Sequence, residues 1–268
     1  MGFQRAILTH GGADSDSKNT DGTKTAANIG MDLMIKNRSS LTAAVNAVAF
    51  LEDDPRFNAG IGSQPRADEE TIQLDAACMT SKEQFGAVAC VEGVQNPIKL
   101  AERILLDSPH ILLTGQGAHH FAKEHNIFIK PLSSLNVGTP LKKNPTCDTV
   151  GAITFDGETF AAALSSGGLA KASIGRVGDV PLPGCGLFCG KIGAVACTGD
   201  GESIALKVLA KEVYGWLEQG MKPDDAAKKA LTLFDTTIDI GLILLTKNEF
   251  AANSRTDMAW SHLVEAKL

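Results

Sequence analysis

Four short loops in the second half of the sequence combine glycine with hydroxyl or charged side chains. They follow one another within residues 148–202 and read Asp148-Thr149-Val150-Gly151, Ser165-Ser166-Gly167-Gly168, Gly175-Arg176-Val177-Gly178-Asp179 and Thr198-Gly199-Asp200-Gly201-Glu202. Each loop alone is typical of an ordinary turn, because glycine, serine and threonine are common turn residues. Their succession in one stretch of chain instead indicates a site that joins hydroxyl groups with an arginine and acidic residues.

The usual catalytic signatures are missing from this sequence. It contains no G-x-S-x-G elbow, no P-loop, no H-E-x-x-H motif and no kinase motif set. His119 and His120 are adjacent on a predicted helix and point apart, which favours a surface pair over a metal site. Cys185, Cys189 and Cys197 lack a second Cys or His pair at zinc-finger spacing, so we interpret them as small buried residues. No metal or cofactor is predicted from these residues.

In combination, the four loops resemble the catalytic subunit of the isoaspartyl peptidase/plant-type asparaginase family, whose relatives include aspartylglucosaminidase and the threonine aspartases. The first half of the sequence independently resembles the family's noncatalytic subunit. The motifs that carry this second resemblance are His10-Gly-Gly-Ala13, Phe57-Asn-Ala-Gly-Ile-Gly-Ser63, Leu74-Asp-Ala-Ala77, Asn96-Pro97 and Leu113-Thr-Gly-Gln-Gly-Ala118. The resemblance implies an α+β fold, the four-layer αββα sandwich of the N-terminal-nucleophile hydrolases, in one structural domain.

This resemblance implies that the precursor cuts its own bond between Asp148 and Thr149. Residues 1–148 would form the α subunit, ending in a flexible linker from about residue 131, and residues 149–268 would form the β subunit. Thr149 would then carry a free α-amino group, whose reference pKa of about 8 suits a base at neutral pH. A threonine hydroxyl needs such a base to act as a nucleophile, so the site requires no histidine.

The same resemblance assigns roles around Thr149. Its hydroxyl would attack the side-chain amide carbon of the substrate and form an acyl-enzyme, from which water releases aspartate. Thr198 and the backbone N–H of Gly199 would stabilise the oxyanion, because tetrahedral intermediates need fixed donors. Ser166 stands where relatives contact the nucleophile with Thr or Ser. Asn58 matches a loop asparagine near the catalytic threonine.

Arg176 and Asp179 are predicted to select the substrate. A guanidinium fork suits an α-carboxylate, and a carboxylate balances an α-ammonium group. Because they are three residues apart, the two side chains could instead pair with each other on a turn, but the surrounding motifs favour substrate binding. The resemblance also places Gly201 in the substrate site and the loop around Gly11 close to it, where that loop accommodates backbone movement during self-cleavage.

The predicted chemistry does not determine which leaving group the substrate carries. We expect a β-aspartyl dipeptidase and L-asparaginase, with a small molecule or dipeptide as substrate. Asp148 resembles the residue found in aspartylglucosaminidase and the threonine aspartases, and Ser165–Ala170 resembles the threonine aspartases. Those aspartases lack an acid at the position of Asp179, which separates them from this chain. The alternatives are a glycosylasparaginase, a threonine-aspartase-type endopeptidase, or an unprocessed noncatalytic homologue.

The elements that must position these residues are predicted from hydrophobic periodicity and turn signals. Asn96 is expected to cap a helix that has Pro97 in its first turn. The pattern indicates helices packed on antiparallel sheets. The predicted strands cover residues 6–9, 71–79, 85–91, 111–114, 150–155, 159–164 and 241–246, and the predicted helices cover about 25–35, 39–51, 97–106, 118–125, 202–219 and 223–234.

Composition narrows the classes of partner. A net charge of −6 without a basic stripe argues against nucleic acid. The absence of a run of about 18 apolar residues predicts no transmembrane helix, and the N-terminus lacks the apolar core of a signal peptide, so we expect a cytoplasmic protein. The resemblance further implies a homodimer of αβ units and a structural sodium ion held by backbone carbonyls in the loop 51–63, which would leave no side-chain signature.

Overall fold

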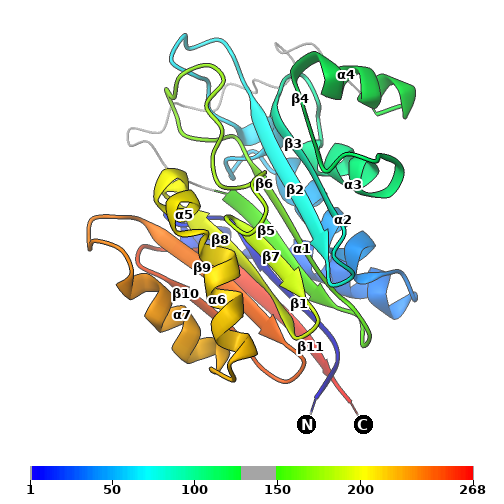
Figure 1. Cartoon of the computed structure of the whole chain (residues 1–268), viewed down its shortest axis with the longest axis vertical. Coiled ribbons are helices and arrows are strands. Elements are labelled where there is room, and N and C mark those ends of the chain that lie inside the picture. Colours follow the sequence, from blue (N-terminus) through cyan, green and yellow to red (C-terminus); the bar gives the residue numbers. More distant parts are fainter. Residues whose placement is uncertain (1, 128–148, 268) are drawn as a thin grey trace.

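The computed structural model describes residues 2–127 and 149–267, which form two β-sheets with helices on their outer faces (Figure 1). The larger sheet has the strand order β11-β1-β5-β6-β2-β3-β4, and the smaller has the order β10-β9-β8-β7. The pairing of β3 with β4 is parallel, whereas the other pairs of named strands are antiparallel. The strands are β1 (Phe3–His10), β2 (Leu74–Thr80), β3 (Phe85–Val91), β4 (Leu112–Thr114), β5 (Thr149–Phe155), β6 (Phe160–Ser166), β7 (Leu187–Gly190), β8 (Gly193–Gly199), β9 (Ile240–Thr246), β10 (Phe250–Ser254) and β11 (Trp260–Ala266).

Helices α1, α2 and α3 pack on the larger sheet, and α6 and α7 pack on the smaller one (Figure 1). Separate apolar clusters fill the space under each helical layer and the space between the sheets. This arrangement confirms the predicted α+β class. No helix within the two described ranges is both long enough and apolar enough to cross a membrane. The helices are η1 (Ser17–Asn19), α1 (Thr20–Ile35), α2 (Ser40–Glu52), η2 (Gly60–Gly62), α3 (Pro97–Asp107), α4 (Gly115–Glu124), α5 (Gly201–Lys207), α6 (Leu209–Glu218) and α7 (Pro223–Thr232).

Side-chain alternation along the strands explains why hydroxyl groups gather between the sheets. On β5, Val150 packs toward the helices, whereas Ile153 packs toward the other sheet. Successive side chains on a strand point to opposite faces, so Thr149 shares the face of Ile153. The same alternation places Ser166 of β6 and Thr198 of β8 in the space between the sheets. Thr149 is paired with Ser166, and the Thr198 hydroxyl lies 3.4 Å from the Thr149 backbone nitrogen, so the three residues lie at one end of that space.

The prediction of a single long helix over residues 202–219 is wrong. This segment forms two helices, α5 and α6, which meet at Val208. The backbone of Val208 is left-handed, with φ 48° and ψ 47°, which is costly for a β-branched residue. The amides of Ala210 and Lys211 donate to the carbonyls of Cys185 and Gly184 at 3.1 and 2.9 Å. These contacts with a distant loop satisfy the first turn of α6 and fix the break.

The start of α3 also differs from the prediction. Pro97 occupies the first turn as expected, but the side chain of Asn96 makes no capping hydrogen bond with the helix. Its amide nitrogen donates instead to Asp53. The Oε1 atom of Glu52, at the end of α2, accepts the backbone N–H of Ile98 at 3.0 Å. A buried carboxyl from a neighbouring helix therefore caps α3.

We expect Glu52 to make the protein less stable as the pH rises. Burial raises its pKa from 4.5 to about 8, against the smaller effect of the hydrogen bond from the Ile98 backbone. Between these values the folded chain holds a proton that the unfolded chain releases. Its contribution is therefore complete below pH 4.5 and lost as the pH rises toward 8, by up to about 1.4 kcal/mol per unit. Thermal unfolding at pH 5 and 8 should show a smaller difference for Glu52→Gln than for the wild type.

The exposed Glu158 offers a matched control for this measurement. The substitution Glu158→Gln removes the same charge from the surface and should leave the pH dependence as it is in the wild type. An equal pH dependence in Glu52→Gln and the wild type would show that Glu52 titrates alike in the folded and unfolded chains.

Candidate active site

The described part of the chain contains a pocket at the end of the space between the two sheets. Thr149, Ser166 and Gly199 enter it from the ends of β5, β6 and β8. The pocket thus brings together hydroxyl groups, a cation and two acids from segments that lie far apart in the sequence. Its other lining residues are Asp75, Gly168, Leu169, Arg176, Gly178, Asp179, Val180 and Gly201.

The Thr198 hydroxyl connects Thr149 to the loop that follows β1. Its oxygen accepts the backbone N–H of Ala13 at 3.0 Å and lies 3.4 Å from the backbone nitrogen of Thr149. Thr149 and Thr198 are 3% and 0% exposed. The Thr198 oxygen therefore lies beside the bond at which self-cleavage is predicted. Asp148, the other residue of that bond, and the predicted linker lie outside the described residues.

His10 stands behind this end of β5 and adds no positive charge to it. The ring packs against Gly151 and is fully buried. Burial lowers its pKa to about 3, against a smaller effect of the Thr149 backbone, so the imidazole is neutral at physiological pH.

Asn58 holds the turn after β6. Its side-chain amide donates to the carbonyl of Gly168 at 2.8 Å, and its backbone carbonyl accepts the N–H of Gly167 at 2.9 Å. The Ser166 hydroxyl accepts the N–H of Gly168 at 3.0 Å, which closes the turn from the other side. The contacts of Asn58 are thus with the loop beneath the pocket, and Asn58 is not among the residues that line it.

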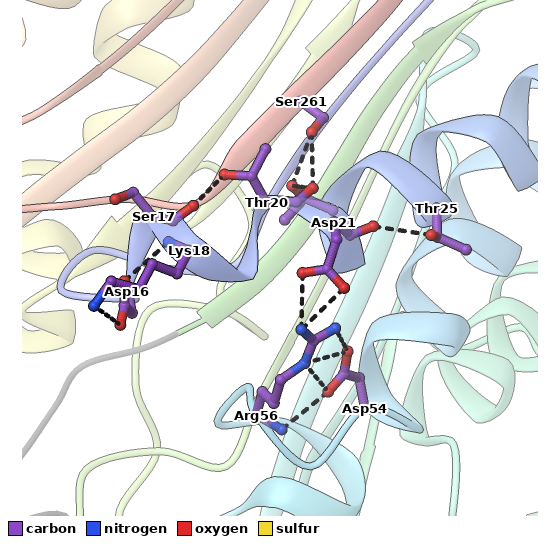
Figure 2. Close-up of polar contacts among 10 residues, drawn as sticks. Asp16, Ser17, Lys18, Thr20, Asp21, Thr25, Asp54, Arg56 and Ser261 are labelled. Atoms are coloured by element: carbon purple, nitrogen blue, oxygen red, sulfur yellow. Dashed lines mark hydrogen bonds and ion pairs between the residues drawn. The ribbon is translucent and has the colours of Figure 1, made fainter.

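The loop that carries Asn58 is fixed to α1 by Arg56 (Figure 2). The guanidinium binds Asp21 of α1 at 2.8 Å and Asp54 of its own loop at 2.6 Å. The next side chain, Phe57, packs so closely on Gly11 that a Cβ atom there would overlap the ring. Gly11 therefore lies behind the pocket with Asn58, in a layer that supports the predicted catalytic residues.

Arg176 pairs with an acid that sequence reasoning did not consider. Its Nε and Nη2 atoms donate to the two carboxylate oxygens of Glu202 at 2.8 and 2.5 Å. The alternative in which Arg176 pairs with Asp179 on a turn is therefore wrong. A bidentate pair of this kind fixes the plane of the guanidinium. Because Glu202 is half-exposed, the pair lies at the edge of the pocket. Among the described residues, the Nη1 atom of Arg176 has no hydrogen-bond acceptor.

Asp179 is 4% exposed, and its Oδ2 atom has no hydrogen-bond partner among the described residues. Burial raises its pKa to about 7, while the positive charge of Arg176 acts in the opposite direction. Gly201 keeps the space between these side chains open, because a Cβ atom there would lie 2.8 Å from Nη2 of Arg176 and 3.0 Å from Oδ1 of Asp179. The pocket therefore holds a cation and an acid side by side, as a zwitterionic head group requires.

Asp75 also lines the pocket, and the sequence did not predict it as a site residue. Its strand position is directly opposite Ser166, which in turn is opposite Thr149. It is 1% exposed, and burial raises its pKa. A carboxylate inside an apolar strand is the signal that was available, because acids are almost never buried without a partner.

Comparisons with known proteins show the family of the chain. The model of the family described as asparaginase matches residues 2–137 and 132–267. The isoaspartyl peptidase/L-asparaginases of Xenopus laevis and Danio rerio are 35% and 34% identical to the chain, over 98% of its length and 93% of theirs. The plant-type L-asparaginase of Pyrococcus horikoshii is 35% identical over 85% of the chain and 84% of its own length. The protein is thus a hydrolase. It belongs to the asparaginase family, as the resemblance of its motifs predicts.

Proposed function

We propose that the chain is a self-processing threonine amidohydrolase that cleaves the side-chain amide of asparagine or of β-aspartyl dipeptides and releases aspartate. The observation that carries the proposal is the pocket in which Thr149 and Ser166 meet Arg176 and Asp179. Its groups match both parts of such a substrate, since hydroxyl groups and oppositely charged side chains line the same pocket. The names of the relatives support the same reaction.

The proposed reaction begins with Thr149 as the first residue of a new chain. Its α-amino group takes the proton of its own hydroxyl, and the oxygen attacks the amide carbon. The hydroxyl of Thr198 and the N–H of Gly199 stabilise the oxyanion that forms. The C–N bond then breaks, the amine leaves with a proton, and a water molecule hydrolyses the ester on Thr149 to release aspartate. The buried position of Thr198 near the Thr149 nitrogen supports its part in both cleavage reactions.

Recognition of the aspartyl head group is assigned to Arg176, Asp179 and Gly201. The guanidinium, oriented by Glu202, binds the α-carboxylate, and Asp179 balances the α-ammonium. Gly201 leaves room for both groups, because any side chain there would meet the two charged residues. The proximity of the acid also explains why an endopeptidase, whose substrate has no free α-amino group, fits this pocket less well.

The pKa of Asp179 gives this proposal a pH dependence. Burial raises that pKa to about 7, so the acid is neutral below pH 7 and a counter-charge above it. We expect kcat/KM for asparagine to rise through pH 7 by up to about tenfold per unit, with a second limb from the Thr149 amine at about 8. Asp179→Asn should lose the limb near 7 and keep the other. A pH profile of unchanged shape in Asp179→Asn would show that Asp179 does not control binding.

The remaining properties of the proposed enzyme concern its assembly. We infer a division into an α subunit of residues 1–148 and a β subunit of residues 149–268, the four-layer αββα sandwich of the N-terminal-nucleophile hydrolases, and a homodimer of αβ units. Two sheets with helices on their outer faces support the layering. The cytoplasmic location stays a prediction of the sequence.

A sodium ion held in the loop 51–63 also stays part of the proposal. A Cβ atom at Gly62 would meet the carbonyl oxygens of Phe57 and Pro55, and one at Gly60 would meet that of Glu52, so the loop packs closely around several backbone carbonyls. Carbonyl oxygens are ligands that suit hard cations. Such an ion would hold the loop that carries Asn58, and no step of the proposed reaction passes through it.

The experiment that tests the function compares four substrates on the purified full-length protein. We expect release of aspartate from asparagine and from β-aspartyl-leucine. Hydrolysis of glycosylasparagine alone would identify a glycosylasparaginase, and cleavage of a protein after an internal aspartate would identify an endopeptidase. A chain that stays uncut and hydrolyses none of the four would be the noncatalytic homologue.

A further inference from the structure

The loop that carries Arg176 depends on another part of the chain for its conformation. It connects β6 to β7 over residues 167–186 and contains no helix or strand of its own. It runs beside the segment that precedes β2 (Figure 1), where Ala67 donates its N–H to Ala172 at 2.9 Å and Lys171 donates to Pro65 at 3.1 Å. A connection of this length without internal secondary structure needs contacts from outside to hold one conformation.

Two acceptors at the start of β2 hold the backbone on both sides of Arg176. The Oε1 atom of Gln73 accepts the N–H of Gly175 at 2.7 Å. The Oδ2 atom of Asp75 accepts the N–H of Gly178 at 3.4 Å. Gly175 has a φ of 84°, a conformation that side chains rarely adopt, so the loop is bent at the point where Gln73 binds it.

The carbonyl of Arg176 itself receives two donors. The Nη2 atom of Arg66 and the thiol of Cys90 each lie 3.4 Å from this oxygen. The same Nη2 atom donates to the backbone carbonyl of Gln73 at 3.0 Å, which ties the two supports together. The loop is therefore held at Gly175, Arg176 and Gly178 by side chains from residues 66–90.

The three supports are buried, and Arg66 and Asp75 are ionisable side chains that lie close enough to influence each other. Arg66, Gln73 and Asp75 are 0%, 6% and 1% exposed. Arg66 stabilises the ionised form of Asp75, which also accepts the N–H of Cys90 at 2.8 Å. Buried hydrogen bonds to a charged group are stronger and more directional than exposed ones. The arrangement therefore resists small shifts of the loop, as a guanidinium that must reach a carboxylate requires.

We propose that Arg66, Gln73 and Asp75 are positioning residues that set the place of the Arg176 guanidinium and thereby the affinity for the α-carboxylate of the substrate. This inference rests on the proposed function. All three residues belong to the half of the chain before Thr149, and the loop belongs to the half after it. After self-cleavage, the α subunit would therefore determine how the β subunit recognises its substrate.

The test uses the full-length, self-processed protein and the variant Gln73→Met, which removes the acceptor for Gly175 without changing side-chain length. The KM for asparagine should rise roughly tenfold while kcat stays within about twofold, because a lost hydrogen bond displaces Arg176 but not Thr149. The inhibition constant of aspartate should rise with KM. Inhibition by β-alanine, which lacks the α-carboxylate, should not change.

Two further variants complete the experiment. Gln84→Met makes the same substitution at an exposed position and should match the wild type. Arg66→Lys keeps a cation near Asp75 but loses the Nη2 atom that donates to the carbonyls of Gln73 and Arg176, so its KM should also rise. A wild-type KM in Gln73→Met and Arg66→Lys would overturn the inference. Equal losses of affinity for aspartate and β-alanine, together with a lower melting temperature, would also overturn the inference, because they would show that these residues have a structural role only. A wild type that does not hydrolyse asparagine would overturn the proposed function as well.

Discussion

The variant Thr149→Ala is expected to remain a single chain and to have no measurable amidase activity. Without the hydroxyl there is no nucleophile for self-cleavage or for attack on a substrate, and loss of a nucleophile typically lowers kcat by a factor on the order of 10⁴ or more. Intact mass after incubation at neutral pH should show two fragments for the wild type, one ending at Asp148 and one beginning at Thr149. The variant should show one uncut chain. Aspartate release should be absent from the variant.

Thr149→Ser provides the matched control, because it retains a hydroxyl and a potential α-amino group. It should cut itself and hydrolyse asparagine, at lower rates because the missing methyl group leaves the hydroxyl less fixed in its buried site. Cleavage of Thr149→Ala at the same bond, between residues 148 and 149, would assign self-cleavage to another residue. An uncut wild-type chain would leave the nitrogen of Thr149 in a peptide bond and remove the base from the proposed reaction.

The second large effect is expected for Arg176→Met. Removing one partner of a charge-paired hydrogen bond costs about 2–5 kcal/mol, which corresponds to a loss in kcat/KM for asparagine of roughly 30-fold to several thousandfold. The loss should appear mainly in KM, because in the proposed reaction Arg176 binds the head group and does not touch the reacting carbon. Steady-state kinetics with asparagine and a β-aspartyl dipeptide should show the same change, since both share the α-carboxylate.

Arg176→Lys keeps the charge but not the planar fork and should recover only part of this loss. Glu202→Gln tests whether the ion pair orients the guanidinium, and a moderate increase in KM is expected. Full activity of Arg176→Met would show that the pocket binds its substrate without this arginine. If Arg176→Met lost both self-cleavage and the folded state, Arg176 would have a structural role instead.

Much of the site was predictable because its chemistry is local in the sequence. Each of the four loops consists of a few adjacent residues, namely those around Thr149, Ser166, Arg176 and Thr198. Such a motif can be recognised in the sequence without knowing where the loop lies in the fold. Strands such as β5, β6 and β9 were predictable for a related reason, since continuous apolar runs between turn residues are their signature. The membership of the asparaginase family follows from these local motifs.

The sequence alone did not indicate β7, β8, β10 or β11. Strand β8 is made of small residues without alternating polarity, because both of its faces are buried. Nor did periodicity reveal the break at Val208, since the apolar face of a helix continues across it. The break depends on the carbonyls of Gly184 and Cys185, which sequence distance separates from α6.

The sequence by itself thus determined which groups the protein offers for the proposed chemistry, namely a threonine hydroxyl without a histidine base, an arginine and an acid. Only the tertiary structure decided which partners these groups have. Arg176 faces Glu202 rather than Asp179, and Asp75 joins the pocket from a strand of the other half. The physical reason is that residue type is a local property, whereas hydrogen bonds, burial and the resulting pKa of a carboxyl depend on side chains that only the packing of the two sheets brings together.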